Sequence, residues 1–80
     1  MQQDFFTGYF EREVLRKRPY LQTRWCVAAL ERPLRTERQE NNRWRHWAAV
    51  PEFGGRILRV VTLADRVTIH NAFFDRGFRP

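Results

Sequence analysis

Two histidines are the side chains in this sequence best suited to moving protons near neutral pH. His46 lies in the run RWRHW (residues 43–47), and His70 is followed by Asn71. RNA can be cut without a metal when its own 2′-hydroxyl attacks the adjacent phosphate. The protein must then supply a base, an acid and cations for the developing charge. We therefore expect His70, Arg59 and His46 to be the catalytic residues of such a reaction.

Arginine is the second chemical signal in the sequence. The formal net charge is +6, and every basic side chain except Lys17 is an arginine. A guanidinium binds phosphate through two parallel hydrogen bonds and stacks on aromatic rings. This composition favours nucleic acid as a partner, although codon usage in a GC-rich genome would enrich arginine equally. The candidate nucleic-acid-binding residues are Arg38, Arg43, Arg45, Trp47 and Arg76.

Structural roles compete with these functional ones. A strand histidine can simply be hydrogen-bonded in place, and a tryptophan is more often part of a core than of a binding surface. Arg59 is a charge within an apolar strand, which is typical either of a site or of the open face of a sheet. Asp75 or Glu37 could orient a histidine. No spacing here is a catalytic signature by itself.

Length and composition exclude several classes of protein. The chain has 80 residues, which allow one small core and one domain, residues 1–80. It contains no serine and a single cysteine, Cys26, so serine catalysis and a cysteine-rich zinc site are excluded. We expect no cofactor and no bound metal. Cys26 is expected in the core of a cytoplasmic protein. No apolar run approaches a membrane span, and the first residues do not resemble a signal peptide.

The pattern of apolar residues predicts two helices followed by strands. Helices are expected at residues 4–18, capped by Asp4 or Thr7, and at residues 23–31, capped by Thr23. Strands are expected at residues 34–40, 43–50, 56–63 and 67–74. This order predicts an α+β fold, with two N-terminal helices on one face of a three- to four-stranded antiparallel meander.

The first hairpin decides which side chains face each other. With Asn41 and Asn42 as a two-residue turn, Glu37 faces His46 and Arg38 faces Arg45. A like-charged pair costs stability unless an anion lies between the two residues. The arginine pair therefore indicates a phosphate site, unless it is screened by solvent or the register is shifted by one residue.

Residues from about Phe10 to Pro80 resemble a family of small bacterial proteins of unknown function. The shared segments are residues 14–21 (VLRKRPYL), Trp25-Cys26, Pro33, Pro51-Glu52, residues 58–63 (LRVVTL) and the closing motif HNAFFDR at residues 70–76. Relatives often carry Asp-Gly in the third turn, where this chain has Asp65-Arg66. The family is distantly similar to ribonuclease toxins of the RelE and BrnT type. This resemblance implies RNA as the substrate and an antitoxin protein as the partner.

Three hypotheses about function follow. An RNA-cleaving toxin domain requires His70 and Arg59 on one open surface. A non-catalytic module that binds nucleic acid or protein requires a broad basic face with tryptophan and no convergent histidine. A structural subunit requires an exposed apolar patch, formed by Phe5, Phe6, Phe73, Phe74 or Phe78. The sequence does not fix the strand register that separates them, and it leaves the oligomeric state open.

Overall fold

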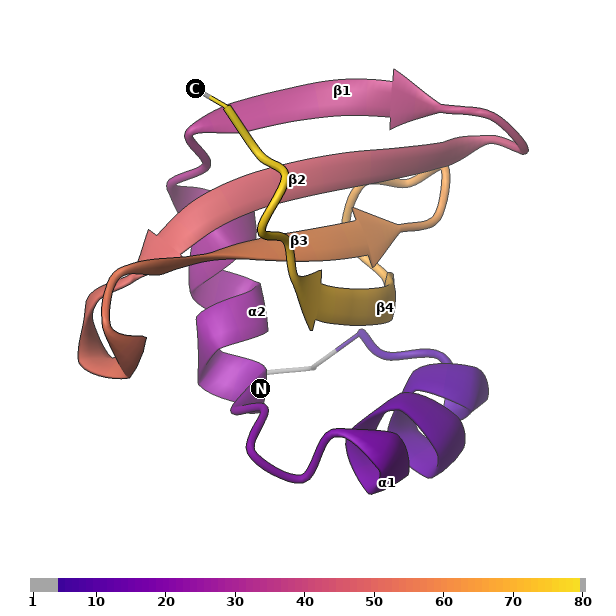
Figure 1. Cartoon of the computed structure of the whole chain (residues 1–80). Coiled ribbons are helices and arrows are strands. Elements are labelled where there is room, and N and C mark those ends of the chain that lie inside the picture. Colours follow the sequence, from indigo (N-terminus) through magenta and orange to yellow (C-terminus); the bar gives the residue numbers. More distant parts are fainter. Residues whose placement is uncertain (1–4, 80) are drawn as a thin grey trace.

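The computed structural model describes residues 5–79 and shows an α+β fold (Figure 1). The helical elements are a π-helical segment Phe10–Val14, which continues into α1 (Leu15–Lys17), and α2 (Thr23–Glu31). The strands are β1 (Arg35–Gln39), β2 (Arg43–Val50), β3 (Arg56–Thr62) and β4 (Ile69–Phe74). They form one antiparallel sheet in the order β1-β2-β3-β4. The α+β class and the meander are thereby confirmed.

The helices begin near the predicted residues. Thr7 caps the first helical segment as expected, because its Oγ1 accepts a hydrogen bond from the Phe10 amide at 3.1 Å. The alternative cap, Asp4, lies outside the described residues. Helix α2 spans the predicted range, but Gln22 occupies its cap position and Thr23 is already helical. The prediction of Thr23 as a cap is therefore wrong by one residue.

Helix α2 lies across β2 and β3, behind the sheet in Figure 1. Its buried residues, Cys26 and Ala29, join a core that includes Leu58 and Val60 of β3. Phe10 and Val14 of the N-terminal segment belong to the same core. Cys26 is 0% exposed, which confirms it as a core residue, and burial raises the pKa of its thiol to about 12. The expectation that both helices cover one face of the sheet stays a prediction.

The N-terminal segment runs beside β4. Phe6 forms a parallel bridge with Ile69, whose amide donates to the Phe5 carbonyl at 2.9 Å. The Thr7 amide in turn donates to the Ile69 carbonyl at 3.0 Å. These bonds occupy the outer edge of β4 at its first residue, which would otherwise be open for pairing with another chain.

The first hairpin has a different register from the one predicted. Thr36 pairs with His46, Glu37 with Arg45 and Arg38 with Trp44, so the loop contains Glu40 as well as the two asparagines. Both asparagines have positive φ, 68° and 58°, a conformation that asparagine tolerates in turns. The predicted pairs Arg38–Arg45 and Glu37–His46 are therefore wrong, and Arg45 faces a carboxylate instead of another arginine.

Strand β4 begins at Ile69, two residues later than predicted. The Asp65 carboxylate accepts hydrogen bonds from the amides of Val67 and Thr68, which keeps these residues in the turn. The pairing with β3 then shifts, because Val61 pairs with Asn71 whereas Thr62 pairs with Ile69. His70 is thus the extra residue of a β-bulge, a feature that re-aims a side chain.

No helix within residues 5–79 is long and apolar enough to cross a membrane.

Candidate nucleic-acid interface

A row of alternating arginine and aromatic side chains crosses all four strands. Arg35 pairs with Trp47, Trp47 with Arg59, and Arg59 with Phe73. Directly paired residues point to the same side of a sheet, so these four side chains share one face. Leu58 and Val60, the strand neighbours of Arg59, point the other way into the core beneath α2. The row therefore lies on the side of the sheet away from α2.

The aromatic rings hold the guanidinium groups of this row. Arg59 lies 5.6 Å from the Trp47 ring centre and 5.2 Å from that of Phe73. Arg35 and Arg45 approach Trp47 at 6.0 and 5.5 Å. Each contact of this kind contributes about 0.5–2 kcal/mol, more when it is desolvated. We call Arg35, Arg45 and Arg59 with Trp47 and Phe73 the arginine face.

Carboxylates neutralise only part of this charge. Arg45 pairs with Glu37 at 3.1 Å and Arg35 reaches the same carboxylate at 3.7 Å. Arg59 lies 3.7 Å from Asp75 and donates to Gln39 at 3.3 Å. Two carboxylates thus form ion pairs with three guanidinium groups.

Two donors on the arginine face have no acceptor. The Nε atoms of Arg45 and Arg59 are buried, and neither has a hydrogen-bond partner among the described residues. Burying an unpaired donor costs free energy, more when the group is charged. Because both Nε atoms are closed to solvent, an anion would meet these arginines at the exposed parts of their side chains, which are 31% exposed for Arg45 and 24% for Arg59.

The segment after β4 covers part of the face. It runs in front of β3 and β2 towards β1 (Figure 1). Asp75 accepts a hydrogen bond from Trp47 Nε1 at 2.9 Å, and Phe78 stacks on the Trp47 ring at 5.2 Å. Trp47 is consequently only 5% exposed. It forms the floor beneath the arginines, so a base cannot stack on it while Phe78 is in place.

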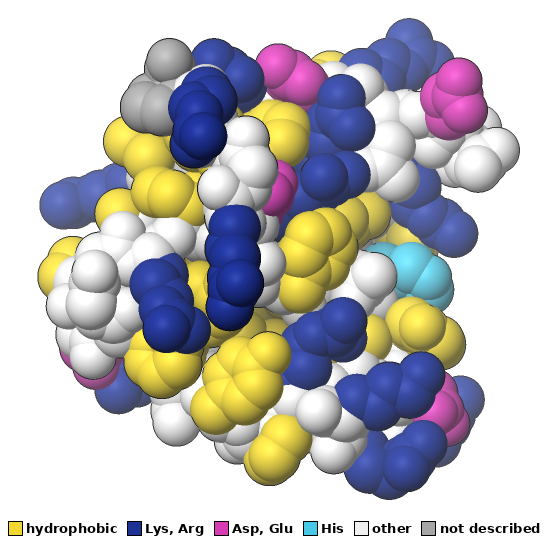
Figure 2. All heavy atoms as spheres, in the orientation of Figure 1, with side chains coloured by type: hydrophobic (Ala, Val, Ile, Leu, Met, Phe, Trp, Pro, Cys, Tyr) yellow, Lys and Arg dark blue, Asp and Glu magenta, His cyan; other side chains and the backbone are white. Residues whose placement is uncertain are grey.

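Basic side chains are spread over this side of the molecule. Figure 2 shows the face in the orientation of Figure 1, with arginine side chains separated by apolar ones and few acidic groups between them. Arg43 precedes Arg45 by two residues on β2 and extends the same side of the strand. Such a surface attracts a polyanion over its whole width.

His70 stands at the edge of the sheet with one ring nitrogen engaged. Its Nδ1 lies 3.0 Å from Thr7 Oγ1, and its ring stacks on Tyr9 at 4.9 Å. Partial burial, followed by the nearby charge of Arg43, lowers the His70 pKa. No partner of its Nε2 is found within residues 5–79. In the neutral tautomer in which Nδ1–H donates to Thr7 Oγ1, this nitrogen carries a lone pair and can accept a proton.

His46 occupies a different environment. It is 4% exposed, and its ring nitrogens lie 2.9 Å from Thr62 Oγ1 and 3.3 Å from Thr36 Oγ1. Burial, reinforced by the charge of Arg66, lowers its pKa. His46 is thus a buried side chain whose two ring nitrogens both have threonine partners.

These lowered pKa values predict that the protein loses stability in mild acid. Below pH 6.5 the histidines bind protons more readily in the unfolded chain than in the folded one. The free energy of unfolding therefore falls as pH falls. Each histidine adds a slope of at most about 1.4 kcal/mol per pH unit. Urea denaturation between pH 7.5 and 5 measures it. His46→Gln should flatten the profile more than His70→Gln, and equal profiles for all three proteins would contradict this assignment.

The structure brings only some of the predicted residues together. Arg45, Trp47 and Arg59 lie on the arginine face, whereas Arg38 lies opposite Trp44 on the other side of the sheet. Arg76 lies in the turn after β4. Asp75 and Glu37 bind the arginines and Trp47, and no described contact joins either carboxylate to a histidine. His70 and Arg59 likewise share no described contact.

Sequence reasoning missed Arg35 and Phe73 as parts of the interface. Both enter through pairing, Arg35 opposite Trp47 and Phe73 opposite Arg59. The correct registers of the first and last hairpins would have placed both residues in the row. A register that is shifted pairs other side chains with Trp47 and Arg59 instead. Within residues 5–79, no group of three or more potential metal-binding side chains lies together.

No protein-family model matches the sequence, and no curated protein or solved structure gives a match either.

Proposed function

We propose that this chain binds RNA through the arginine face. The observation that carries the proposal is the row Arg35, Trp47, Arg59 and Phe73, in which rings and guanidinium groups alternate across the sheet. The resemblance to RelE- and BrnT-type toxins favours RNA over DNA. We place RNA binding before RNA cleavage, because the row of arginine and aromatic side chains can bind a strand without a histidine beside it.

The chemistry of the row suits a phosphate backbone. A guanidinium that lies over a ring uses its flat surface, and the N–H groups at its edge stay available for an anion. The side chains of Arg45 and Arg59 are 31% and 24% exposed, so a phosphate can approach them from solvent. A phosphate that binds there would compete with the carboxylates of Glu37 and Asp75 for the N–H groups of these arginines. Charge-assisted bonds of this kind position a strand without reading its sequence.

Fluorescence anisotropy with a labelled single-stranded RNA of about twelve nucleotides tests the proposal. Binding should weaken steeply with salt, with a slope of log K against log salt of about −0.7 for each phosphate contact. DNA of the same sequence is the comparison and should bind more weakly. The absence of binding even at low salt would contradict the proposal.

RNA cleavage is a second candidate function, favoured by the state of His70. Its Nδ1 lies beside Thr7, its ring stacks on Tyr9, and its lowered pKa favours the neutral ring. With the proton on Nδ1, the unpartnered Nε2 can take a proton from a 2′-hydroxyl. Arg43, whose charge helps to lower that pKa, is the candidate to hold the phosphate. As in the toxins that the sequence resembles, a partner antitoxin would then mask the basic face.

Induced expression in a bacterial host tests the cleavage hypothesis. We expect growth to stop with the wild-type chain and to resume with His70→Ala, because no proton acceptor remains. Arg59→Ala should also restore growth, by weakening RNA binding. Western blots and melting curves must show that both variants are present and folded. Normal growth with abundant wild-type protein, or arrest that persists in His70→Ala, would exclude this mechanism.

A further inference from the structure

A hollow beside the arginine face combines free positive charge with aromatic rings. It has a volume of about 600 Å³ and lies where β4 meets the N-terminal helical region and the loop after β2. Ligand sites commonly have volumes of about 300–1,000 Å³. Its lining consists of arginine and aromatic side chains, without an acidic residue: Arg18, Tyr20, Phe53, Arg56, Phe73, Phe74 and Arg76.

The arginines of the hollow differ from those of the arginine face in having no carboxylate. No ion pair within residues 5–79 involves Arg18, Arg56 or Arg76. Rings orient two of them instead, since Arg18 lies 5.9 Å from the Phe73 ring centre and Arg56 lies 5.1 Å from that of Phe53. Three like charges without a counter-charge repel one another, and an anion placed between them relieves that repulsion.

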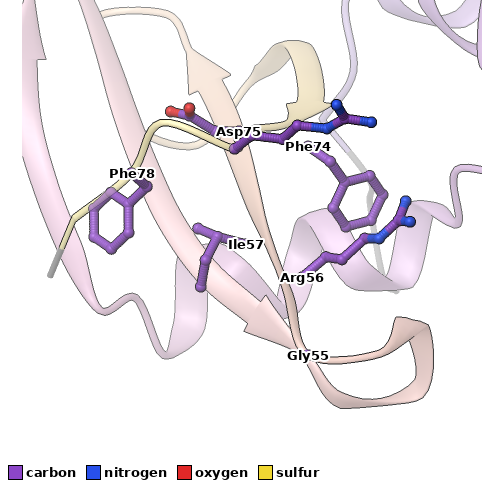
Figure 3. Close-up of a pocket in the computed structure, with 7 residues that line it drawn as sticks. Gly55, Arg56, Ile57, Phe74, Asp75 and Phe78 are labelled. Carbon is purple, nitrogen blue, oxygen red and sulfur yellow. The ribbon is translucent and has the colours of Figure 1, made fainter.

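The aromatic wall provides the apolar half of the site. Phe53 and Phe74 stack at 4.8 Å, and Tyr20 lies nearly parallel to Phe53 at 6.0 Å. Tyr20 is 46% exposed, so part of its ring is free to contact a ligand. A second hollow of about 350 Å³ shares Arg56, Phe74 and Arg76 with the first and places Phe78 on its far side (Figure 3).

We propose that this hollow binds an unpaired nucleotide, with the base against the aromatic wall and the phosphate between the three arginines. Phe73 belongs both to the hollow and to the arginine face, so a strand on the face can continue into the hollow. This inference rests on the proposed RNA binding and deepens it, because only a single strand can present an unpaired base. A free mononucleotide offers the same chemistry.

Calorimetric titrations with four ligands test the proposal: a single-stranded RNA, its blunt duplex, AMP and ribose 5-phosphate. The wild-type chain should prefer the single strand to the duplex about tenfold, and AMP to ribose 5-phosphate. Tyr20→Leu should reduce both preferences, because it removes an exposed ring without changing the charge. Arg18→Gln with Arg56→Gln should weaken AMP and the single strand but leave duplex binding. Arg16→Gln with Arg32→Gln, two exposed arginines that do not line the hollow, is the matched control.

The outcomes separate the hollow from the arginine face. AMP binding without a preference for the single strand would identify a free mononucleotide as the ligand of the hollow. Unchanged RNA and AMP binding in the Arg18 and Arg56 double variant would overturn the inference while the arginine face remains. If RNA binding is lost when Arg45 and Arg59 are changed but not when Arg18 and Arg56 are changed, the inference about the hollow is also overturned. Binding of an acidic aromatic peptide, with no nucleotide binding, would overturn it in favour of a protein partner.

Discussion

Replacing Arg45 and Arg59 together by glutamine is expected to weaken RNA binding about a hundredfold near physiological salt. Each substitution removes a charge-assisted contact to phosphate, and the two contacts together lower the slope of log K against log salt by about 1.4. Both guanidinium groups lie over the Trp47 ring, and both side chains are partly exposed. Anisotropy titrations at four or five salt concentrations measure the affinity and the slope in one experiment.

The control must remove the same charge elsewhere. Arg16 lies on α1 in an exposed pair with Glu13, and Arg32 is exposed at the end of α2. Their double glutamine variant has the same net charge as the test variant and should keep most of the affinity. If both double variants lose affinity equally, binding depends on net charge alone and the arginine face has no special role. Melting curves must show that the test variant folds, because Asp75 loses one of its partners.

The sequence predicted the elements well because their apolar periodicity is strong. The bounds of α2 and β2 match the prediction, and β1 and β3 differ only at their ends. The late start of β4 follows from Asp65, whose carboxylate binds two following amides. Periodicity does not report such a local polar interaction, so it places the end of a turn less accurately than the middle of a strand.

The hairpin register could not be derived from charge pairing. Glu37 finds a basic partner in either register, His46 in the predicted one and Arg45 in the observed one. The observed register also places Thr36 opposite His46. On the buried side of the sheet, a histidine needs polar partners for both ring nitrogens, and Thr36 and Thr62 provide them. Satisfaction of a buried group, rather than surface charge, is therefore the physical difference between the registers.

The candidate site was predicted in part for the same reason. Strand alternation correctly grouped Arg43, Arg45 and Trp47 on one side of β2. It could not join them to Arg59, because the face of one strand relative to the next depends on register. The histidines were selected by chemical type alone. The structure places His46 in the core and His70 in a bulge beside Thr7, and neither position follows from residue spacing.

Phe10→Ala is expected to reduce the free energy of unfolding by about 3–5 kcal/mol, as for other large buried aromatic side chains. Phe10 is 0% exposed and stacks on Phe6 at 5.3 Å. Since small domains have a total stability of about 5–15 kcal/mol, the variant should be close to unfolding at 37 °C. Urea denaturation followed by tryptophan fluorescence measures the loss, because the tryptophans lie in strand β2 and helix α2.

Phe5→Ala provides the contrast, because the same side chain is removed from a position that is 45% exposed. It should cost less than about 1 kcal/mol, in the range of surface substitutions. The comparison also tests how the site is held. The segment that begins at Phe10 is anchored by this ring, and it follows directly on Thr7 and Tyr9, which hold His70. Equal losses for the two variants would mean that Phe10 is not a core residue, and His70 would then lack the rigid support that the proposed proton transfer requires.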